Sequence, residues 1–320
     1  MGCGASTGVA RPLFIVGTSR SGTSWAFDLC ASHPDLSMGF ESKLPIEGIE
    51  VHRRHGPLRD RADMERLLAA LATEVDHSSN DALRDALRRP DVVDHAVEAH
   101  RRAPGWASIC EAIFRSSEGT SHWGNKLLRI ELAPTLSQQW PGAKFLVLTR
   151  DPRGVMASQS RKFDHSIEYS AMYWNTHARH VHDRLGLVPG KSDEDHLVVD
   201  VVEMARDPRR ALEWAFAGVG LSTDPVEELA ARFPGHPELL DRWRQDLVPT
   251  RQRRVEEYCF EQMVALGYQP ELATSATSIG AVRRTVALVR EHGAQLVRDP
   301  RAIRRKQVGR RVQAALARGR

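Results

Sequence analysis

The sequence predicts an α/β fold in which a central parallel sheet is flanked by helices. Three short runs rich in branched and apolar side chains, Leu13–Val16, Lys144–Thr149 and Leu197–Val201, are each followed by a loop and then by helical spacing. Strands that are apolar along most of their length are typical of parallel sheets covered on both faces. The 320 residues, 41% of them hydrophobic and 27% charged, suffice either for one large α/β domain or for a domain with an appendage.

Helical periodicity accounts for most of the remaining chain. Leu58–Arg115, between the first two strands, is rich in Leu, Ala and Arg, and predicts a helical insertion with breaks near His77–Asn80 and Pro90–Val92. Further helices are expected in five places: Trp25–Cys30, from about Arg153, Pro208–Val219, Ser170–Leu187, and Arg251–Leu266 before Gly267.

Composition and cysteine spacing exclude several protein classes. No window approaches the roughly 20 apolar residues of a membrane helix. The four cysteines, Cys3, Cys30, Cys110 and Cys259, match neither a disulfide framework nor a metal-binding spacing. We therefore expect a cytoplasmic protein with reduced thiols. The start Met1–Ser6 fits an N-myristoylation pattern with Cys3 as a palmitoyl site, and the competing expectation is a flexible terminus over residues 1–11.

Charge is distributed unevenly along the chain. Residues 281–320 contain 12 Lys and Arg against 2 Asp and Glu, so this segment carries +10 while the whole chain carries only +4. The other 280 residues therefore sum to −6. Two basic helical segments, 281–297 and 300–317, follow a linker at 273–280. This extension is predicted to contact an anionic partner or to pack as a solvated helical pair on the acidic body.

The loop Gly17–Ser24 lies between the first strand and its helix, where backbone N–H groups and the helix dipole favour an anion. Its spacing resembles the P-loop Gly-x-x-x-x-Gly-Lys-[Ser/Thr], except that Thr23 occupies the lysine position and Arg20 is the loop cation. A nucleotide triphosphatase also needs a strand-ending Asp for magnesium, and we find no apolar strand ending in an Asp at the expected place. The loop therefore predicts a phosphate or sulfate site that needs no metal.

Several motifs together resemble the sulfotransferases that use 3′-phosphoadenosine-5′-phosphosulfate (PAPS). The segment Arg20-Ser21-Gly22-Thr23-Ser24-Trp25 resembles their 5′-phosphosulfate loop, in which the Trp of cytosolic members stacks on adenine. Arg150-Asp151-Pro152-Arg153 through Ser158 resembles the 3′-phosphate motif. His33-Pro34-Asp35 resembles the segment that follows the first helix in the tyrosylprotein and bacterial branches. Weaker similarity is found in two later segments, Asp241–Arg244 and Leu266-Gly267-Tyr268.

The resemblance covers about Pro12–Pro270 and implies the P-loop NTPase-like sulfotransferase fold. It predicts a sulfotransferase domain over 12–270, followed over 271–320 by a linker and a basic helical extension. It also implies that PAPS is the co-substrate, that PAP is the product, and that no metal takes part. The implied PAPS-binding residues are Arg20, Ser21, Gly22, Thr23, Ser24, Trp25, Arg150 and Ser158.

Three residues are expected to carry the chemistry. Arg20 and Lys126, which ends the short predicted strand His122–Lys126, would stabilise charge on the sulfuryl group and the leaving oxygen. The acceptor hydroxyl needs a general base. Cytosolic sulfotransferases use a His two residues after the lysine, where this chain has Leu128, whereas the tyrosylprotein and bacterial branch uses a Glu that corresponds to Glu41. His122 is the alternative base.

The acceptor and some alternatives stay open. A hydroxyl on a small molecule, glycan, lipid or peptide is expected, in a pocket built from residues 44–115 and 169–188, and the chain is a candidate homodimer. Lys126 could instead be a surface lysine with its stem on the core. The competing functions are a P-loop small-molecule kinase and a catalytically idle nucleotide-binding scaffold. Magnesium and ATP dependence would identify the kinase.

Overall fold

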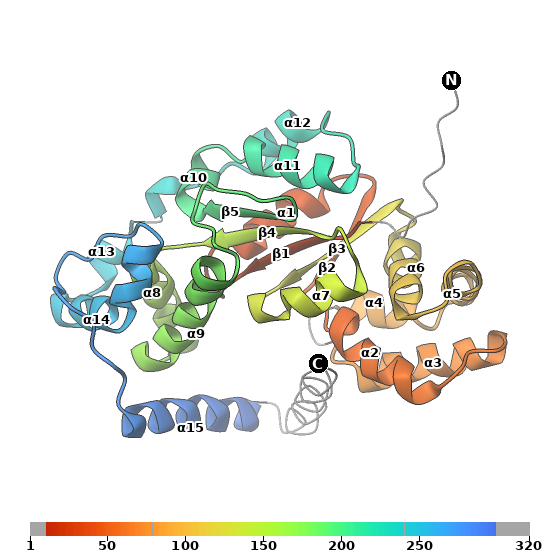
Figure 1. Ribbon diagram of the computed structural model, residues 1–320, viewed down its shortest axis with the longest axis horizontal. Helices are drawn as coiled ribbons and strands as arrows, with labels where there is room; N and C mark the ends of the chain where they lie inside the picture. The colour runs from red at the N-terminus through yellow and green to blue at the C-terminus, as the bar shows by residue number, and fades with distance from the viewer. Residues whose placement is uncertain (1–10, 78–79, 240, 299–320) are drawn as a thin grey trace.

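The computed structural model describes residues 11–77, 80–239 and 241–298, and its centre is one parallel sheet (Figure 1). Its five strands lie in the order β2-β3-β1-β4-β5, and every neighbouring pair is parallel. They are β1 (Leu13–Gly17), β2 (Leu36–Phe40), β3 (His122–Leu127), β4 (Lys144–Thr149) and β5 (His196–Asp200). The predicted parallel α/β sheet is therefore confirmed.

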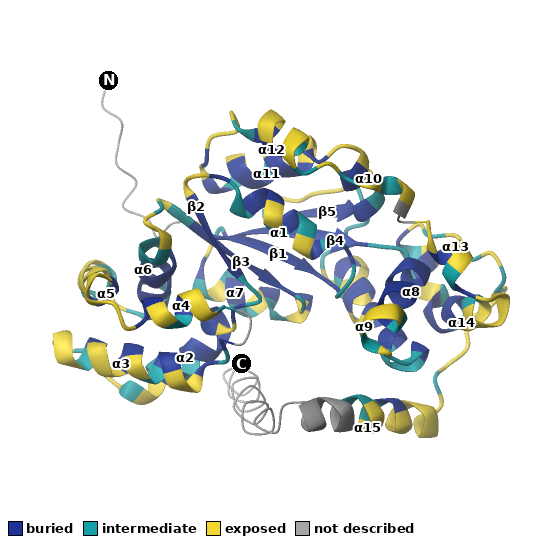
Figure 2. Ribbon diagram, turned by 180° about the vertical axis from the view of Figure 1, so that it is seen from behind, coloured by how far each residue is buried: buried dark blue, intermediate teal, exposed yellow. Residues whose placement is uncertain are grey.

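Alternation along each strand divides the core into two layers. Leu13 and Ile15 of β1 pack into one cluster of buried side chains, and Phe14 and Val16 pack into the other. All four are fully buried, because successive side chains of a strand point to opposite faces and both faces are covered. In Figure 2 the strands are dark blue and the exposed residues lie on the outer helices.

Helices cover both faces of the sheet. One face packs against α1 (Thr23–Ala31), α11 (Arg209–Val219) and α12 (Val226–Arg232). The other packs against α6 (Trp106–Glu118), α7 (Ala133–Gln139), α8 (Pro152–Phe163), α9 (Ile167–Arg179) and α14 (Pro249–Ala265). Short elements complete the connections: α10 (Val201–Arg206), α13 (Trp243–Asp246), the 3₁₀ turns η1 (Ile130–Leu132) and η3 (Pro237–Leu239), and the π-helical turn η2 (His180–Arg184).

The predicted helical insertion is present beyond β2 and β3 (Figure 1). It consists of α2 (Leu44–His55), α3 (Arg61–Glu74), α4 (Asp81–Ala86), α5 (Pro90–Arg102) and α6. The break predicted at Pro90–Val92 is wrong by a few residues, because Pro90 starts α5 at the helical position where its missing N–H costs nothing. The break near His77–Asn80 is confirmed, and Asn80 caps α4 by accepting a hydrogen bond from Leu83 N.

Two features of the sheet differ from the prediction. The β2 strand was not predicted, because Leu-Ser-Met-Gly-Phe is too mixed in polarity to indicate a buried strand. No apolar strand ending in an Asp was expected at the magnesium position, whereas β5 ends at Asp200. The Asp200 carboxylate caps α10 by accepting a hydrogen bond from Val202 N at 2.7 Å, and it also accepts one from the Tyr268 hydroxyl. Asp200 is thus occupied by structural contacts.

The chain continues past the sheet into α15 (Ala281–Arg298), which confirms the helix predicted over 281–297. The second basic segment at 300–317 and the flexible terminus at 1–11, apart from Arg11, lie outside the described residues. The acylation pattern at Gly2 and Cys3 lies there too. Within the described ranges, no helix is both long enough and apolar enough to span a lipid bilayer.

Candidate active site

The loop after β1 lies at the carboxyl edge of the sheet, between the ends of β3 and β4. The chain leaves β1 toward β2 on one side and later returns to β4 on the other, and such a switch point forms a crevice in α/β sheets. Gly22 has φ +83° and precedes α1 without capping it by a side chain. The first-turn N–H groups of α1, from Thr23 and Ser24, therefore have no partner from a cap and can face an anion.

Two arginines meet at this loop. Arg20 Nε donates a hydrogen bond to Ser158 Oγ of α8 at 2.9 Å, and Arg150 Nη1 donates one to the Arg20 carbonyl oxygen at 2.9 Å. Burial lowers the pKa of Arg150, and the neighbouring charge of Arg20 lowers it further. Two guanidinium groups are thus held close together in a partly desolvated site, an arrangement that an incoming anion stabilises.

Lys126 and Glu41 form the second charged group of the site. Phe40 pairs with Lys126 in the sheet, and Lys126 Nζ lies 2.6 Å from Glu41 Oε1, 3.2 Å from Ser24 Oγ and 3.9 Å from the centre of the Phe40 ring. The Lys126 side chain is only 2% exposed, so the alternative of a surface lysine is wrong. The lysine spans from the end of β3 to the first turn of α1, next to the anion loop.

Asn125 holds the loop that carries Glu41. Its side chain points to the face of the sheet opposite Lys126, because the two are successive strand residues. Asn125 Oδ1 accepts a hydrogen bond from Ser42 N at 3.2 Å, and Nδ2 donates one to the Ser42 carbonyl oxygen at 2.9 Å. Asn125 was not predicted to have a role, although its amide side chain inside a buried strand, next to the lysine, was a signal that could have indicated one.

Two site residues adopt unusual backbone conformations. Arg20 has φ +73° and Glu41 has φ +53°, a left-handed region that costs non-glycine residues roughly 1–2 kcal/mol. Of the non-glycine residues that the structure describes, only Asp164 shares this property, at the end of α8. Strain of this kind concentrates at functional sites, where the surrounding structure over-determines the conformation.

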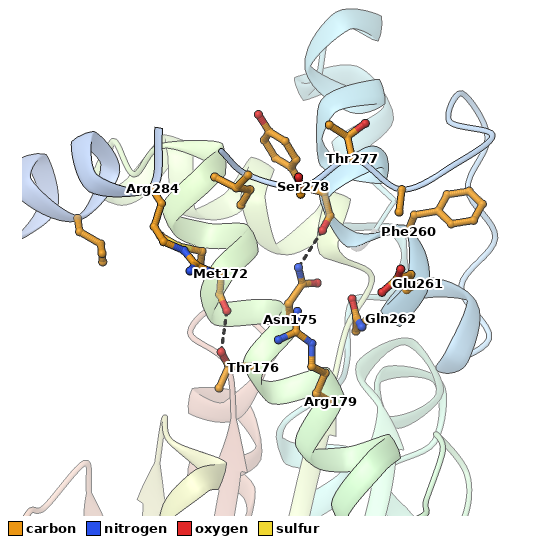
Figure 3. A pocket seen from close by; sticks show the side chains of 14 residues that line it. Met172, Asn175, Thr176, Arg179, Phe260, Glu261, Gln262, Thr277, Ser278 and Arg284 are labelled. Carbon is orange, nitrogen blue, oxygen red and sulfur yellow. Dashed lines mark hydrogen bonds between the residues drawn. The ribbon is translucent and has the colours of Figure 1, made fainter. Parts of the chain in front are cut away.

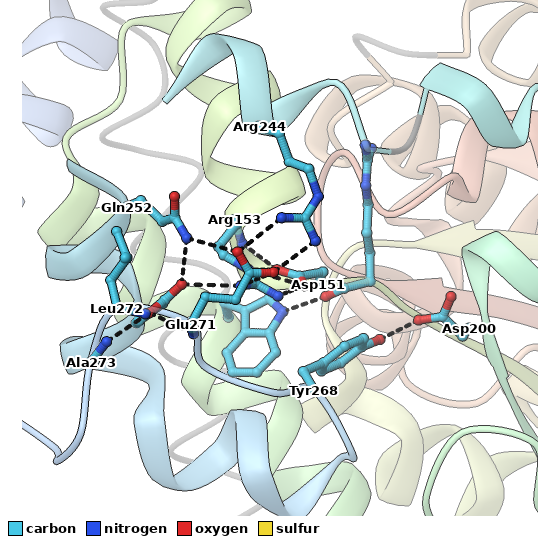
Figure 4. Close-up of polar contacts among 12 residues, drawn as sticks. Asp151, Arg153, Asp200, Arg244, Gln252, Tyr268, Glu271, Leu272 and Ala273 are labelled. Atoms are coloured by element: carbon cyan, nitrogen blue, oxygen red, sulfur yellow. Dashed lines mark hydrogen bonds and ion pairs between the residues drawn. The ribbon is translucent and has the colours of Figure 1, made fainter. Parts of the chain in front are cut away.

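The residues of the motif after β4 lie partly at the site and partly in the core. Arg150 turns toward the loop, whereas Arg153 is 5% exposed and pairs with Asp151 at 2.6 Å and with Glu256 at 3.0 Å (Figure 4). Glu256 is fully buried, and its Oε2 accepts hydrogen bonds from the backbone N–H groups of residues 271–273 at 2.6–3.0 Å. Burial opposes the charge of Glu256, but hydrogen bonds from Gln252 and this backbone together with Arg153 leave its pKa lowered.

The two weakly matching segments join the same network. Arg244 donates two hydrogen bonds to Glu271, at 2.8 and 2.7 Å, and Trp243 lies under the Arg153 guanidinium at 4.1 Å. Tyr268 donates from its hydroxyl to Asp200 at the end of β5 (Figure 4). These residues thus fix the chain that follows α14 against the end of the sheet.

A pocket of about 460 Å³ opens beside Glu41. Thr18, Ser19 and Gln159 line it near the loop, and the remaining lining comes from three regions: Glu41, Lys43, Ile46 and Glu47; Leu127–Arg129 and Leu132; and Phe163, His165, Tyr169 and Tyr173. The pocket predicted from residues 44–115 and 169–188 is thus only partly found. α3, α4, α5 and α6 contribute nothing to its lining, because they pack on the outer side of α2 and β2.

A second hollow of about 740 Å³ lies between α9, α14 and the linker before α15. Figure 3 shows Arg179 and Asn175 on α9 facing Glu261 and Gln262 on α14, with Arg284 of α15 at its rim. Asn175 donates from Nδ2 to the Tyr258 carbonyl oxygen at 2.8 Å and so joins the two helices. This hollow is separate from the residues around Glu41 and Arg20.

The helix α15 reaches the wall of the pocket beside Glu41. Glu291 Oε1 accepts a hydrogen bond from Ser166 N at 3.3 Å, and Glu291 Oε2 lies 3.6 Å from His165 Nε2. Arg290 pairs with Asp164 at 2.7 Å. The first part of the basic extension is therefore docked on the α8–α9 connection, where His165 lines the pocket.

The structure brings together most of the predicted site residues. The loop residues 20–25, Glu41, Lys126, Arg150 and Ser158 all lie at the carboxyl edge of the central strands. The Trp25 indole Nε1 donates a hydrogen bond to the Phe233 carbonyl oxygen at 3.1 Å. His122 is wrong as the alternative base, because it starts β3 four residues before Lys126, about 13 Å away along the strand.

His33 of the predicted His-Pro-Asp segment has a structural role. Its Nδ1 accepts a hydrogen bond from Asp35 N at 3.1 Å, which leaves Nε2 as the donor to the Ser222 carbonyl oxygen, also at 3.1 Å. The ring is buried against Phe216 of α11. His33 therefore anchors the turn between α1 and β2 rather than joining the site.

Solved structures with the same fold include two sulfotransferase domains. The domain from the olefin synthase of Synechococcus PCC 7002 matches with a TM-score of 0.53 and 18% identity, over 83% of this chain and 97% of that one. The domain from the curacin biosynthetic pathway matches with a TM-score of 0.50 and 13% identity, over 82% and 100%. No curated protein matches the chain significantly.

The fold and the site define an α/β protein in which arginine and lysine side chains surround the first loop of a parallel sheet. Residues 12–225 match the model of a family described as the sulfotransferase family. The chain belongs to the sulfotransferase family, and it is a transferase that moves sulfuryl groups.

Proposed function

We propose that the protein transfers the sulfuryl group of PAPS to an acceptor hydroxyl, with Glu41 as the general base. The observation that carries this proposal is the position of Glu41. Its carboxylate lines the pocket and also contacts Lys126, which reaches Ser24 beside the anion loop. One carboxylate thus adjoins both an acceptor pocket and a donor loop.

The residues around the loop suit a donor with two anionic groups. The uncapped start of α1 and the hydroxyls of Thr23 and Ser24 supply donors for a 5′-phosphosulfate. Arg150, Arg20 and Ser158 lie on the side toward α8 and supply donors for a 3′-phosphate. Both pairings support PAPS in preference to a donor with a single phosphate group.

In the proposed reaction, the acceptor oxygen forms a bond to sulfur while the bond from sulfur to the bridging oxygen of PAPS breaks. The proton of the acceptor hydroxyl passes to Glu41, and PAP leaves with the bonding electrons. Charge grows on the bridging oxygen and on the equatorial oxygens, as in phosphoryl transfer. Lys126 and Arg20 are the cations placed to stabilise it.

The Lys126–Glu41 ion pair has a further consequence for this scheme. A bound sulfuryl group competes for the Lys126 ammonium, because both its oxygens and Glu41 are hydrogen-bond acceptors. Donor binding would thus draw Lys126 toward the sulfuryl oxygens and leave the Glu41 carboxylate free to accept a hydrogen bond from the acceptor hydroxyl.

The test is transfer of ³⁵S from labelled PAPS in the presence of excess EDTA, with a panel of hydroxyl compounds as acceptors. We expect labelled product in EDTA and a rise in the melting temperature (Tm) of the protein on addition of PAP. Transfer that instead requires ATP and magnesium would identify a kinase. A protein that binds PAP but transfers nothing to any acceptor of a host-cell extract would be an idle scaffold.

A further inference from the structure

We propose that the acceptor is an uncharged aromatic alcohol, which binds with its ring system on an aromatic wall of the pocket and its hydroxyl toward Glu41. The aromatic wall consists of Phe163, His165, Tyr169 and Tyr173. This inference rests on the proposed function and names the substrate class of the same site.

The four rings of the aromatic wall form a continuous surface. Phe163 stacks on His165 with ring centres 5.1 Å apart and planes at 24°, His165 meets Tyr169 edge-on at 5.2 Å, and Tyr169 meets Tyr173 at 4.9 Å. Such ring contacts favour a further aromatic partner over an aliphatic one of equal area. Tyr173 is 49% exposed, so its ring is available at the pocket mouth.

Aliphatic side chains also line the pocket. They come from Ile46 of α2, from Leu127 at the end of β3, and from Leu128 and Leu132 after it. A flat ring system in contact with these side chains and with the aromatic wall would bury apolar surface. A sugar in the same position would place some of its hydroxyl groups against these apolar side chains, at a cost for each hydroxyl that lacks a hydrogen-bond partner.

The charges of the pocket argue against an anionic acceptor. Both lysine and arginine side chains that line it are already paired, Lys43 with Asp76 at 2.8 Å and Arg129 with Glu131 at 2.8 Å. His165 lies 3.6 Å from the carboxylate of Glu291. Two carboxylates, Glu41 and Glu47, also line the pocket. A negatively charged acceptor would therefore face the Glu41 and Glu47 carboxylates, while Lys43 and Arg129 are already paired with carboxylates of the protein.

The size of the pocket fits this class. About 460 Å³ lies within the range that holds a small molecule and largely encloses it. The uncharged polar residues Thr18, Ser19 and Gln159 line the loop end of the pocket, where Gln159 donates a hydrogen bond to the Ser19 carbonyl oxygen at 3.1 Å. A single hydroxyl at one end of an otherwise apolar molecule matches this distribution.

The experiment compares four acceptors under the PAPS assay, with PAP-induced stabilisation measured first. The compounds are 2-naphthol, its saturated analogue decahydro-2-naphthol, the anion 6-hydroxy-2-naphthoate and methyl glucoside. We expect kcat/KM to be highest for 2-naphthol and at least about tenfold lower for the carboxylate. We expect Tyr173→Leu to raise KM for 2-naphthol about fivefold with little change in kcat, and Tyr173→Phe to restore KM.

One control variant and the PAP-induced stabilisation together make the outcome decisive. Val264→Ala changes an exposed residue of α14 away from both hollows and should leave KM unchanged. The substrate class is overturned if the carboxylate, the saturated alcohol or the glucoside is the best acceptor, or if PAP stabilises the protein but none of the four is sulfated. If PAP does not stabilise the protein and nothing is transferred, the proposed function itself has failed.

Discussion

Asn125 bonds both backbone groups of Ser42, the residue after Glu41, and does so from inside the sheet with no exposed surface. Glu41 in turn has its N–H bonded to the Lys126 carbonyl oxygen at 3.1 Å. The left-handed conformation of Glu41 is therefore held from both sides. Asn125 is a positioning residue for the carboxylate, since its own side chain faces away from Lys126.

Asn125→Ala should reduce both stability and turnover. Two buried backbone groups of Ser42 would lose their partners, which costs roughly 1–3 kcal/mol of unfolding free energy. The free energy is measured by urea unfolding, and kcat is measured well below Tm. We expect kcat to fall at least about tenfold while PAP affinity stays unchanged, because Glu41 loses its fixed position. A purely structural role would leave kcat of the folded fraction at the parent value.

Glu41→Gln should remove turnover without removing donor binding. The amide cannot accept the proton of the acceptor hydroxyl, and general-base contributions are typically about 10²–10⁴-fold. Single-turnover rates with labelled PAPS give the chemical step, and PAP-induced stabilisation gives donor affinity. Lys43→Gln, which changes a half-exposed neighbour that is paired with Asp76, is the matched comparison. Full activity of Glu41→Gln would move the base to another residue.

Arg150→Met should cost donor affinity but little stability. Burial and the nearby Arg20 both disfavour the Arg150 charge in the ligand-free protein, so its removal relieves part of that cost. We expect a Tm within a few degrees of the parent and loss of most of the PAP-induced rise. Arg254→Met on the exposed side of α14 should keep the full rise. A variant that unfolds outright would show that Arg150 is mainly structural.

Glu256→Gln should destabilise the protein most near neutral pH. The folded-state pKa of Glu256 is lowered, so its charge stabilises the fold above the unfolded value near 4.3 and this contribution disappears as pH falls through the folded value. Loss of one partner of the buried Arg153 pair costs about 3 kcal/mol. Urea unfolding at several pH values between 7 and 3.5 should show the gap between parent and variant narrowing in acid. A constant gap would contradict the assigned charge.

Glu291→Gln should weaken acceptor binding selectively. Glu291 of α15 holds Ser166 N and faces His165, so its loss should loosen the wall of the pocket. We expect a higher acceptor KM, by about two- to fivefold, with unchanged PAP affinity. Deletion of residues 281–320 should reproduce this effect or exceed it. If the deletion leaves acceptor kinetics unaltered, α15 has no part in the pocket.

Much of this fold could be predicted from the sequence, because several of its strands and loops have a residue pattern that is recognisable within a few consecutive positions. Leu13–Val16 and Lys144–Thr149 are apolar runs of strand length, and Gly17–Ser24 has the turn residues that a strand-to-helix loop needs. The β2 strand escaped prediction because Gly39 and Ser37 carry no strand signal of their own. Gly39 is required by packing instead, since a Cβ there would lie 2.5 Å from Asn125 Oδ1 and 2.6 Å from the Phe114 ring.

The sequence by itself determined the α/β class and the anion loop with Arg20, because these depend on short-range pattern, and its resemblance to known sulfotransferases pointed to Glu41 and Lys126 as candidates. Only the tertiary structure decided that Lys126 is buried against Glu41, that Asn125 holds Ser42, and that Glu291 reaches the aromatic wall. Each of these contacts joins residues 80 or more positions apart. Strand order and helix packing bring these residues together, and neither can be predicted from a short segment of the sequence.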